Sequence, residues 1–96
     1  MTENKIYKLK LTDQFKADME KHRFSGQVKN LAKITRLLQE IVKNPYVGIG
    51  DPEPLTFDRK GEWSRRITRK HRLVYSVNDE KITVLMISSW GHYGDK

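Results

Sequence analysis

Three side chains in this sequence are of the types that could together cut a phosphodiester bond without a metal ion. Glu53 is a carboxylate that could accept a proton, Arg72 could hold a phosphate, and His92 could donate a proton near neutral pH. Attack of an RNA 2′-hydroxyl on the adjacent phosphate needs a base, a cation and an acid for the leaving 5′-oxygen. The spacing of these residues says nothing about their distance in space, so this set is one hypothesis among several.

Positive charge is in excess and much of it lies in one stretch. The formal net charge is +7, from 19 Lys and Arg against 12 Asp and Glu in 96 residues. Such a balance favours a polyanionic partner, either nucleic acid or an acidic protein. The cations of the densest stretch, residues 59–72, are Arg59, Lys60, Arg65, Arg66, Arg69, Lys70 and Arg72. His71 lies beside them and either flanks a turn or contacts RNA.

Composition excludes several classes of protein. There is no cysteine, and the histidines at 22, 71 and 92 are scattered, so we expect no disulfide, no metal site and no cofactor. Residues 48–50 lack the spacing and the lysine of a nucleotide-binding loop. No apolar run approaches the roughly 20 residues of a membrane span, and no signal peptide is evident. We therefore predict a single cytoplasmic domain over residues 1–96, without membrane contact.

The N-terminal half predicts a strand and two helices. Residues 6–11 alternate apolar side chains with lysines, as in a strand with one buried face. A helix is expected from Thr12 or Asp13 to about His22, where a histidine is more typical of structure than of catalysis. Residues 27–43 repeat apolar side chains, beginning with Val28, at the spacing of an amphipathic helix, and Pro45 ends it.

The C-terminal half predicts a loop followed by strands. Residues 46–55 are expected to form a loop in which flanking prolines hold Glu53 extended. Residues 62–67 and 71–77 alternate as a hairpin that points Arg72 away from the apolar face but leaves Arg65 on it. Residues 82–88 are apolar enough for a central strand covered on both faces. The predicted fold is α+β: a small twisted antiparallel sheet, two helices on one face, in the order β-α-α-β-β-β, with one further strand as an option.

Four blocks of the sequence also resemble a known family. They are GIGDPEPL at 48–55, GEWSRRI at 61–67, HRLVY at 71–75 and the pair His92–Tyr93. In this order they resemble the YoeB/Txe branch of the RelE-type toxins, over residues 45–93. The resemblance implies a microbial ribonuclease-like fold and a ribosome-dependent mRNA endonuclease of a toxin–antitoxin system. It also implies inhibition by a YefM/Axe-type antitoxin.

The resemblance assigns roles to individual residues. Glu53 would be the general base, Arg72 would stabilise the phosphate, and His92 would be the general acid. Tyr93 would orient or stack on an mRNA base. The residues expected to support RNA binding are Arg65, Arg66, Lys70 and His71. Cleavage in the ribosomal A site would leave a 2′,3′-cyclic or 3′-phosphate end and a 5′-hydroxyl.

Two features of this chain depart from the family pattern, and other functions stay open. Asp51 stands where a basic residue is usual, and Trp90-Gly91 replaces a common Arg-Tyr or Lys-Gly pair. The alternative is a non-catalytic module of the same fold that binds nucleic acid or an antitoxin through its basic face. Operator DNA would be bound only by the toxin–antitoxin complex, and a homodimer is a further option.

Overall fold

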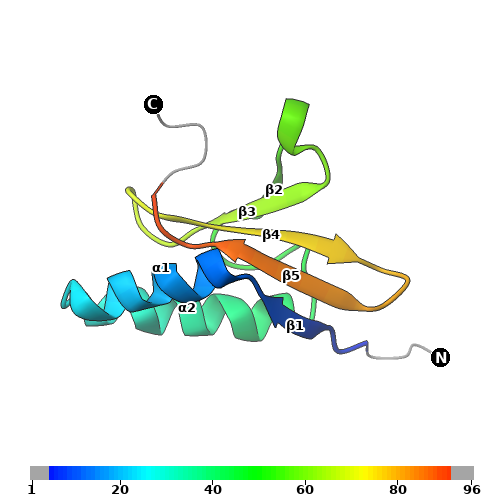
Figure 1. Ribbon diagram of the computed structural model, residues 1–96. Helices are drawn as coiled ribbons and strands as arrows, with labels where there is room; N and C mark the ends of the chain where they lie inside the picture. Colours follow the sequence, from blue (N-terminus) through cyan, green and yellow to red (C-terminus); the bar gives the residue numbers. More distant parts are fainter. Residues whose placement is uncertain (1–4, 92–96) are drawn as a thin grey trace.

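A five-stranded sheet carries two helices against one of its faces in the computed structural model, which describes residues 5–91 (Figure 1). The elements are β1 (Lys8–Leu11), α1 (Asp13–Phe24), α2 (Val28–Ile41), β2 (Glu53–Pro54), the 3₁₀ helix η1 (Phe57–Arg59), β3 (Glu62–Arg66), β4 (Arg72–Asn78) and β5 (Thr83–Ser88). The predicted α+β class is confirmed, with β2 as the additional strand. Within residues 5–91, neither helix has the length and apolar character needed to cross a membrane.

The strand order places the first strand beside the last. The sheet runs β1-β5-β4-β3-β2, and each neighbouring pair from β2 to β5 is antiparallel, as predicted. The pair β1 and β5 is parallel, so the sheet is mixed rather than wholly antiparallel. A parallel pair needs a long crossover, and here the helices and the other strands separate its members in sequence. The exposed lysines of β1, Lys8 and Lys10, lie on this edge and oppose pairing with another sheet.

Helix α1 is fixed at its start by one threonine. The Oγ1 of Thr12 accepts a hydrogen bond from the Phe15 amide at 3.0 Å, the usual N-cap arrangement. The same hydroxyl donates to the carbonyl of Ile87 at 2.8 Å, which ties the helix start to the end of β5. The helix continues to Phe24, two residues past the predicted end at His22.

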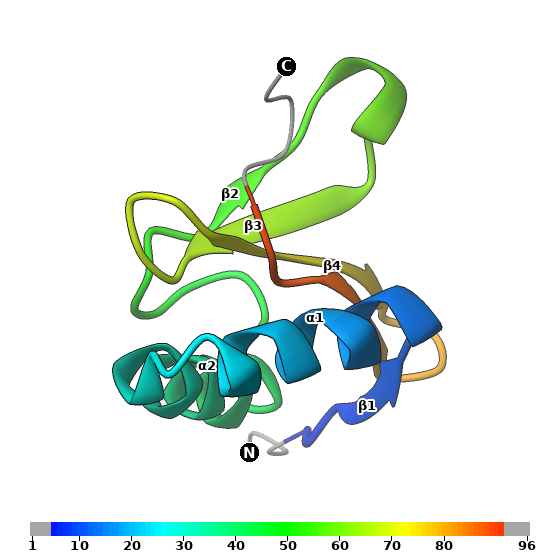
Figure 2. The same cartoon turned by 60° about the vertical axis from the view of Figure 1, so that its left-hand side comes forward.

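Helix α2 covers the sheet through a narrower stripe than the sequence suggested. Ile34, Leu37 and Ile41 are fully buried, whereas Val28 is exposed over 74 % of its surface. Val28 therefore faces solvent and is not part of the core, although Asn30 in the same turn is buried. Figure 2 shows both helices side by side beneath β2, β3 and β4. Their buried stripe meets Leu73 and Tyr75 of β4 and Val84 and Met86 of β5.

Strand β5 is an inner strand, between β1 and β4, but the prediction that it is covered on both faces is wrong. Val84 and Met86 are fully buried against the helices, while Leu85 between them is 37 % exposed. Successive side chains of a strand point to opposite faces, and the helices cover only one of them. Apolar composition alone therefore overstated the burial of residues 82–88.

A carboxylate in the turn between β4 and β5 joins two distant segments. Asp79 accepts hydrogen bonds from the hydroxyls of Tyr7 and Tyr46, which precede β1 and follow α2 respectively. These bonds lower the pKa of Asp79, and burial and the nearby carboxylate raise the pKa of Tyr46. The contact anchors the beginning of the segment that leads to β2.

Candidate active site

Strand pairing brings the predicted base and the predicted phosphate ligand to one face of the sheet. Glu53 in β2 lies opposite Ser64 in β3, and Ser64 lies opposite Val74 in β4. Directly paired residues share a face, and so do residues two apart on one strand, which places Arg72 there as well. The guanidinium Nη1 of Arg72 donates to Ser64 Oγ at 3.2 Å. Glu53 and Arg72 thus flank Ser64 on the face away from the helices.

Arg72 lies on the predicted face but is less accessible than the sequence suggested. Only 9 % of its surface is exposed, and Ser64 beneath it is fully buried. A guanidinium with little water around it interacts more strongly with an approaching phosphate than one in bulk solvent does. Glu53 is half-buried at the edge of the same surface.

Arg66 supplies an accessible positive charge beside this pair. It lies opposite Arg72 in the β3–β4 ladder, and 54 % of its side chain is exposed. Its Nη1 lies 4.0 Å from Oδ2 of Asp51, and the Asp51 side chain is 80 % exposed. Ion pairs this open to solvent contribute little, so Asp51 lowers the local charge without removing Arg66 from reach of a ligand.

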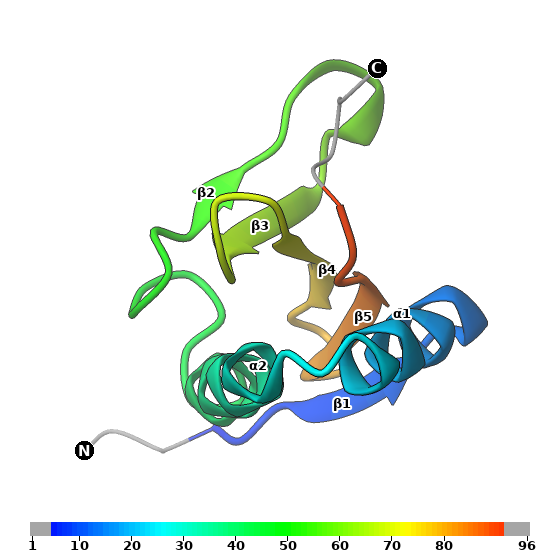
Figure 3. The same cartoon turned by 90° about the vertical axis from the view of Figure 1, so that its left-hand side faces the viewer.

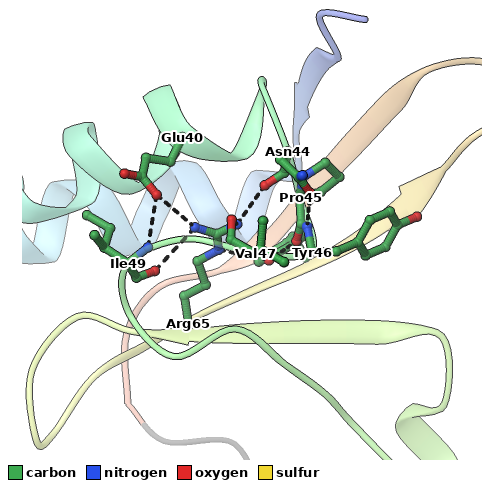
Figure 4. A network of polar contacts seen from close by, with 8 residues as sticks. Glu40, Asn44, Pro45, Tyr46, Val47, Ile49 and Arg65 are labelled. Atoms are coloured by element: carbon green, nitrogen blue, oxygen red, sulfur yellow. Dashed lines mark hydrogen bonds and ion pairs between the residues drawn. The ribbon is translucent and has the colours of Figure 1, made fainter. Parts of the chain in front are cut away.

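The prediction that Arg65 binds RNA is wrong, because its side chain is completely buried. Figure 4 shows the polar groups that surround its guanidinium. Its Nη2 donates to the carbonyl oxygens of Asn44 at 2.8 Å and Val47 at 3.0 Å. Its Nη1 donates to the carbonyl of Ile49 at 3.2 Å, and its Nε donates to the hydroxyl of Tyr75 at 3.0 Å. Arg65 lies on the Trp63 face of β3, which packs against the helices, and there it organises the loop after α2.

Glu40 of α2 completes this network from the helix side. Its Oε1 accepts from the Ile49 amide at 2.9 Å and lies 3.6 Å from Nη1 of Arg65. The Tyr75 hydroxyl donates in turn to the Pro45 carbonyl at 2.6 Å, and burial raises the pKa of this tyrosine. Residues 44–50 are therefore held against β3 by side chains, and they lead directly to Glu53.

Gly50 is required where this loop meets β3. Its φ is +85°, and an added Cβ would lie 2.9 Å from Leu37 Cδ2 and 3.1 Å from the Arg66 carbonyl oxygen. We expect Gly50→Ala to lower the free energy of unfolding by about 1–3 kcal/mol, measured by urea denaturation. Gly61→Ala is the control, because Gly61 also has a positive φ but open space around it. Equal losses in both variants would show that the close approach at Gly50 contributes nothing.

The turn between β3 and β4 borders a cavity of about 840 Å³. Lys70 is exposed at its rim, as an RNA contact requires. His71 instead packs against Trp90, with ring centroids 4.3 Å apart, and accepts a hydrogen bond from the Gly91 amide. Burial, His22 and Lys70 lower the pKa of His71. His71 was predicted either to flank the turn or to contact RNA, and these contacts favour the structural role beside the turn.

Histidines that are far apart in the sequence lie together in the fold. The rings of His22 and His71 have centroids 4.9 Å apart, although 49 residues separate their numbers (71 − 22). His22 is fully buried and bonds the Ser89 carbonyl, in keeping with its predicted structural role. No group of three or more potential His, Cys, Asp or Glu ligands occurs within residues 5–91.

The predicted acid and its neighbour, His92 and Tyr93, lie outside the described residues. The last described residue, Gly91, accepts a hydrogen bond through its carbonyl from the Arg72 amide at 2.9 Å. The backbone that precedes His92 therefore passes next to the candidate phosphate ligand. Figure 3 shows this segment rising from the end of β5 beside the start of β4.

Sequence reasoning missed several polar residues that shape this region. Ser64 was assigned no role, and the buried Asp18 and Asn30 of the helices were assigned none either. A signal for Asp18 was available, because it lies three residues after Phe15 and four before His22, on the buried stripe of α1. A charged residue on an apolar stripe is uncommon unless it has a bonding partner.

A family model described as the YoeB-like toxin of bacterial type II toxin–antitoxin systems matches residues 11–93. The Toxin YoeB of Mycobacterium bovis is 51 % identical over 57 residues, which cover 59 % of this chain and 67 % of the relative. Among solved structures, a YoeB/ParE toxin from Agrobacterium tumefaciens superposes with a TM-score of 0.83. It is 36 % identical, and the match covers 90 % of this chain and 99 % of that one.

Two solved structures of Staphylococcus aureus proteins also match this chain. One is a YoeB dimer, with a TM-score of 0.78, and the other is a heterotetrameric YoeB–YefM toxin–antitoxin complex, with a TM-score of 0.77. In both, the match is 34 % identical and covers 91 % of this chain and 98 % of the other. With its sheet, its helices and the match over residues 11–93, this chain belongs to the YoeB-like family of toxins of bacterial type II toxin–antitoxin systems.

Proposed function

We propose that this toxin is an endoribonuclease that cuts mRNA in the ribosomal A site. The observation that carries the proposal is the placement of Glu53 and Arg72 on either side of Ser64, on the face that the helices leave open. A carboxylate and a nearly buried guanidinium on one surface suit proton removal beside a phosphate. The family to which the chain belongs supports the same reaction.

The proposed reaction needs only side chains of this protein. Glu53 takes the proton of a 2′-hydroxyl, and the resulting oxygen forms a bond to the adjacent phosphorus. Arg72 offsets the negative charge that develops on the phosphate oxygens. The bond from phosphorus to the 5′-oxygen breaks, and His92 protonates that oxygen. The products are a 2′,3′-cyclic phosphate, which water can open to a 3′-phosphate, and a 5′-hydroxyl end.

The supporting contacts to RNA are proposed for the accessible cations of the same region. Arg66 and Lys70 are exposed near the site and can contact phosphates on either side of the cut. Tyr93 is proposed to orient or stack on a base. Arg65 has no part in RNA binding, since its donors are used inside the protein.

Primer extension on mRNA from cells that express the protein tests this function. We expect new 5′-hydroxyl ends inside reading frames, and we expect them to disappear when translation is blocked before mRNA enters the A site. A binding module without catalysis would give salt-dependent RNA binding, with log K falling by about 0.7 per phosphate contact, and no new ends. Absence of new ends while growth is still arrested would refute the proposed reaction.

An antitoxin of the YefM type is proposed as the resting partner. The solved YoeB–YefM complex supports this choice, and the exposed cations around Arg66 and Lys70 suit an acidic polypeptide. Operator DNA is proposed to bind only to that complex, and the YoeB dimer of S. aureus makes a homodimer of the free toxin a second assembly to test. The proposed substrate places the activity in the cytoplasm.

A further inference from the structure

A buried polar cluster on the helices holds the backbone just beyond β5. The amide of Ser89 donates to Asp18 Oδ2 at 2.9 Å, and its carbonyl accepts from His22 Nε2 at 2.7 Å. The other oxygen of Asp18 accepts from Gln14 at 2.7 Å, and the side-chain amide of Asn30 donates to His22 Nδ1 at 3.4 Å. A carbonyl can only accept, so Nε2 of His22 carries the proton of the bond to Ser89.

Gly91 is held in the same way from the start of β4. Its amide donates to His71 Nδ1 at 2.9 Å, and its carbonyl accepts from the Arg72 amide at 2.9 Å. Trp90 lies between these two anchored residues. Its ring packs on His71, and its centroid is 4.9 Å from that of the His22 ring. The N–H of Gly91 can only donate, so Nδ1 of His71 is unprotonated and the ring is neutral.

We propose that three side chains outside the catalytic set, Asp18, His22 and His71, position the candidate acid by fixing the backbone immediately before it. Their hydrogen bonds determine the path of residues 89–91, and His92 is the next residue of the chain. This inference rests on the proposed function, because only an acid at His92 gives the position of that backbone a catalytic meaning.

Stabilisation of the hydrophobic core does not explain why Asp18 and His22 are buried in α1. Asp18 is 1 % exposed and His22 is fully buried, and burying such groups is costly unless each is hydrogen-bonded. Both form a hydrogen bond with the backbone of Ser89. Ser89 directly follows Ser88, the last residue of β5 that pairs with β4. The cluster thus continues the ordering of the chain past the sheet, up to Gly91.

The geometry makes the anchor at Gly91 sensitive to pH. Protonation of His71 at Nδ1 removes the acceptor and sets one N–H against another. Among the described residues, His22 and Asp18 of α1 and Lys70 of the turn act on the charge of this ring. Lys21 of α1 lies over the neighbouring Trp90 ring, and Arg69 of the turn lines the same cavity as His71. The pKa of His71 is lowered from 6.5, chiefly by burial. The anchor is therefore complete above pH 6.5 and is lost as the pH falls through the lower pKa of the folded protein.

Nuclear magnetic resonance of the free wild-type protein, and of its Glu53→Gln variant, tests the anchor without any activity measurement. We expect the Gly91 amide shift to follow the titration of the His71 ring, with a midpoint below 6.5. We also expect the nitrogen shifts of that ring to report the tautomer protonated at Nε2. A Gly91 amide that does not respond while His71 titrates overturns the proposal, whatever the enzyme does.

A pair of variants at one position tests the link to catalysis. In His71→Asn, the side-chain oxygen stands about where Nδ1 stood and can accept from Gly91, whereas His71→Ala has no acceptor. We expect His71→Ala to lower kcat for mRNA cleavage by about 10- to 100-fold with KM changed less than threefold, and His71→Asn to restore kcat. Unchanged kcat in His71→Ala, or a loss that His71→Asn does not restore, overturns the positioning role. If the parent protein itself cuts no mRNA, the proposed function fails instead.

Discussion

Glu53→Gln is expected to slow mRNA cleavage by about 10²- to 10⁴-fold, the contribution of a general base, while leaving the fold intact. Glutamine keeps the size and the hydrogen-bonding oxygen of the side chain but cannot take the 2′-hydroxyl proton. Because β2 is held by its pairing with Ser64 and Trp63 of β3, the substitution should leave the backbone in place. Single-turnover cleavage on ribosomes programmed with mRNA measures the rate.

A matched substitution separates loss of the base from loss of any carboxylate. Glu80→Gln removes the same charge from the exposed turn between β4 and β5 and should cut within twofold of the parent. Equal midpoints of urea unfolding for the two variants would show that stability is not the cause. A Glu53→Gln protein that cuts within threefold of the parent would remove Glu53 from the mechanism.

Arg65→Met is expected to be the most destabilising single change, at about 3–5 kcal/mol. It keeps much of the apolar length of the side chain but leaves the carbonyls of Asn44, Val47 and Ile49 without their guanidinium donor. Unsatisfied buried acceptors carry the cost of lost hydration. Urea denaturation measures the loss, with all variants made in the Glu53→Gln background, which is expected to be less toxic to the host.

The adjacent arginine provides the control for this prediction. Arg66→Met makes the same chemical change on the opposite face, where the side chain is 54 % exposed, and should alter stability by no more than about 0.5 kcal/mol. If Arg65→Met does not fold, Arg65→Lys keeps the charge but not the branched donors and should lie between the two. An effect of Arg65→Met as small as that of Arg66→Met would contradict the role assigned to the network.

Local patterns were sufficient to predict most of the elements. Alternation in residues 62–67 and 71–77, helical spacing in residues 27–43 and a good N-cap at Thr12 each depend on neighbours in the chain, and all were confirmed. Alternation also placed Arg65 with Trp63 and Arg72 on the other side. It did not indicate how deeply either arginine is buried, because burial depends on what packs over each face.

Contacts between distant residues could not be predicted in this way. The parallel pairing of β1 with β5, the capture of Arg65 by carbonyls of the 44–50 loop and the contact of His22 with His71 each join segments far apart in the sequence. Such contacts depend on the path of the whole backbone, and no local spacing encodes them.

For the candidate site, the sequence by itself determined which residue types were available, namely the carboxylate of Glu53, the guanidinium of Arg72 and the terminal histidine. Only the tertiary structure decided that Glu53 and Arg72 share a face across Ser64, since that follows from strand register. The tertiary structure also decided that the Arg65 side chain lies in the interior and not at the candidate site. The physical reason is that buried carbonyls of an irregular loop need donors, and Arg65 is the side chain whose strand position reaches them.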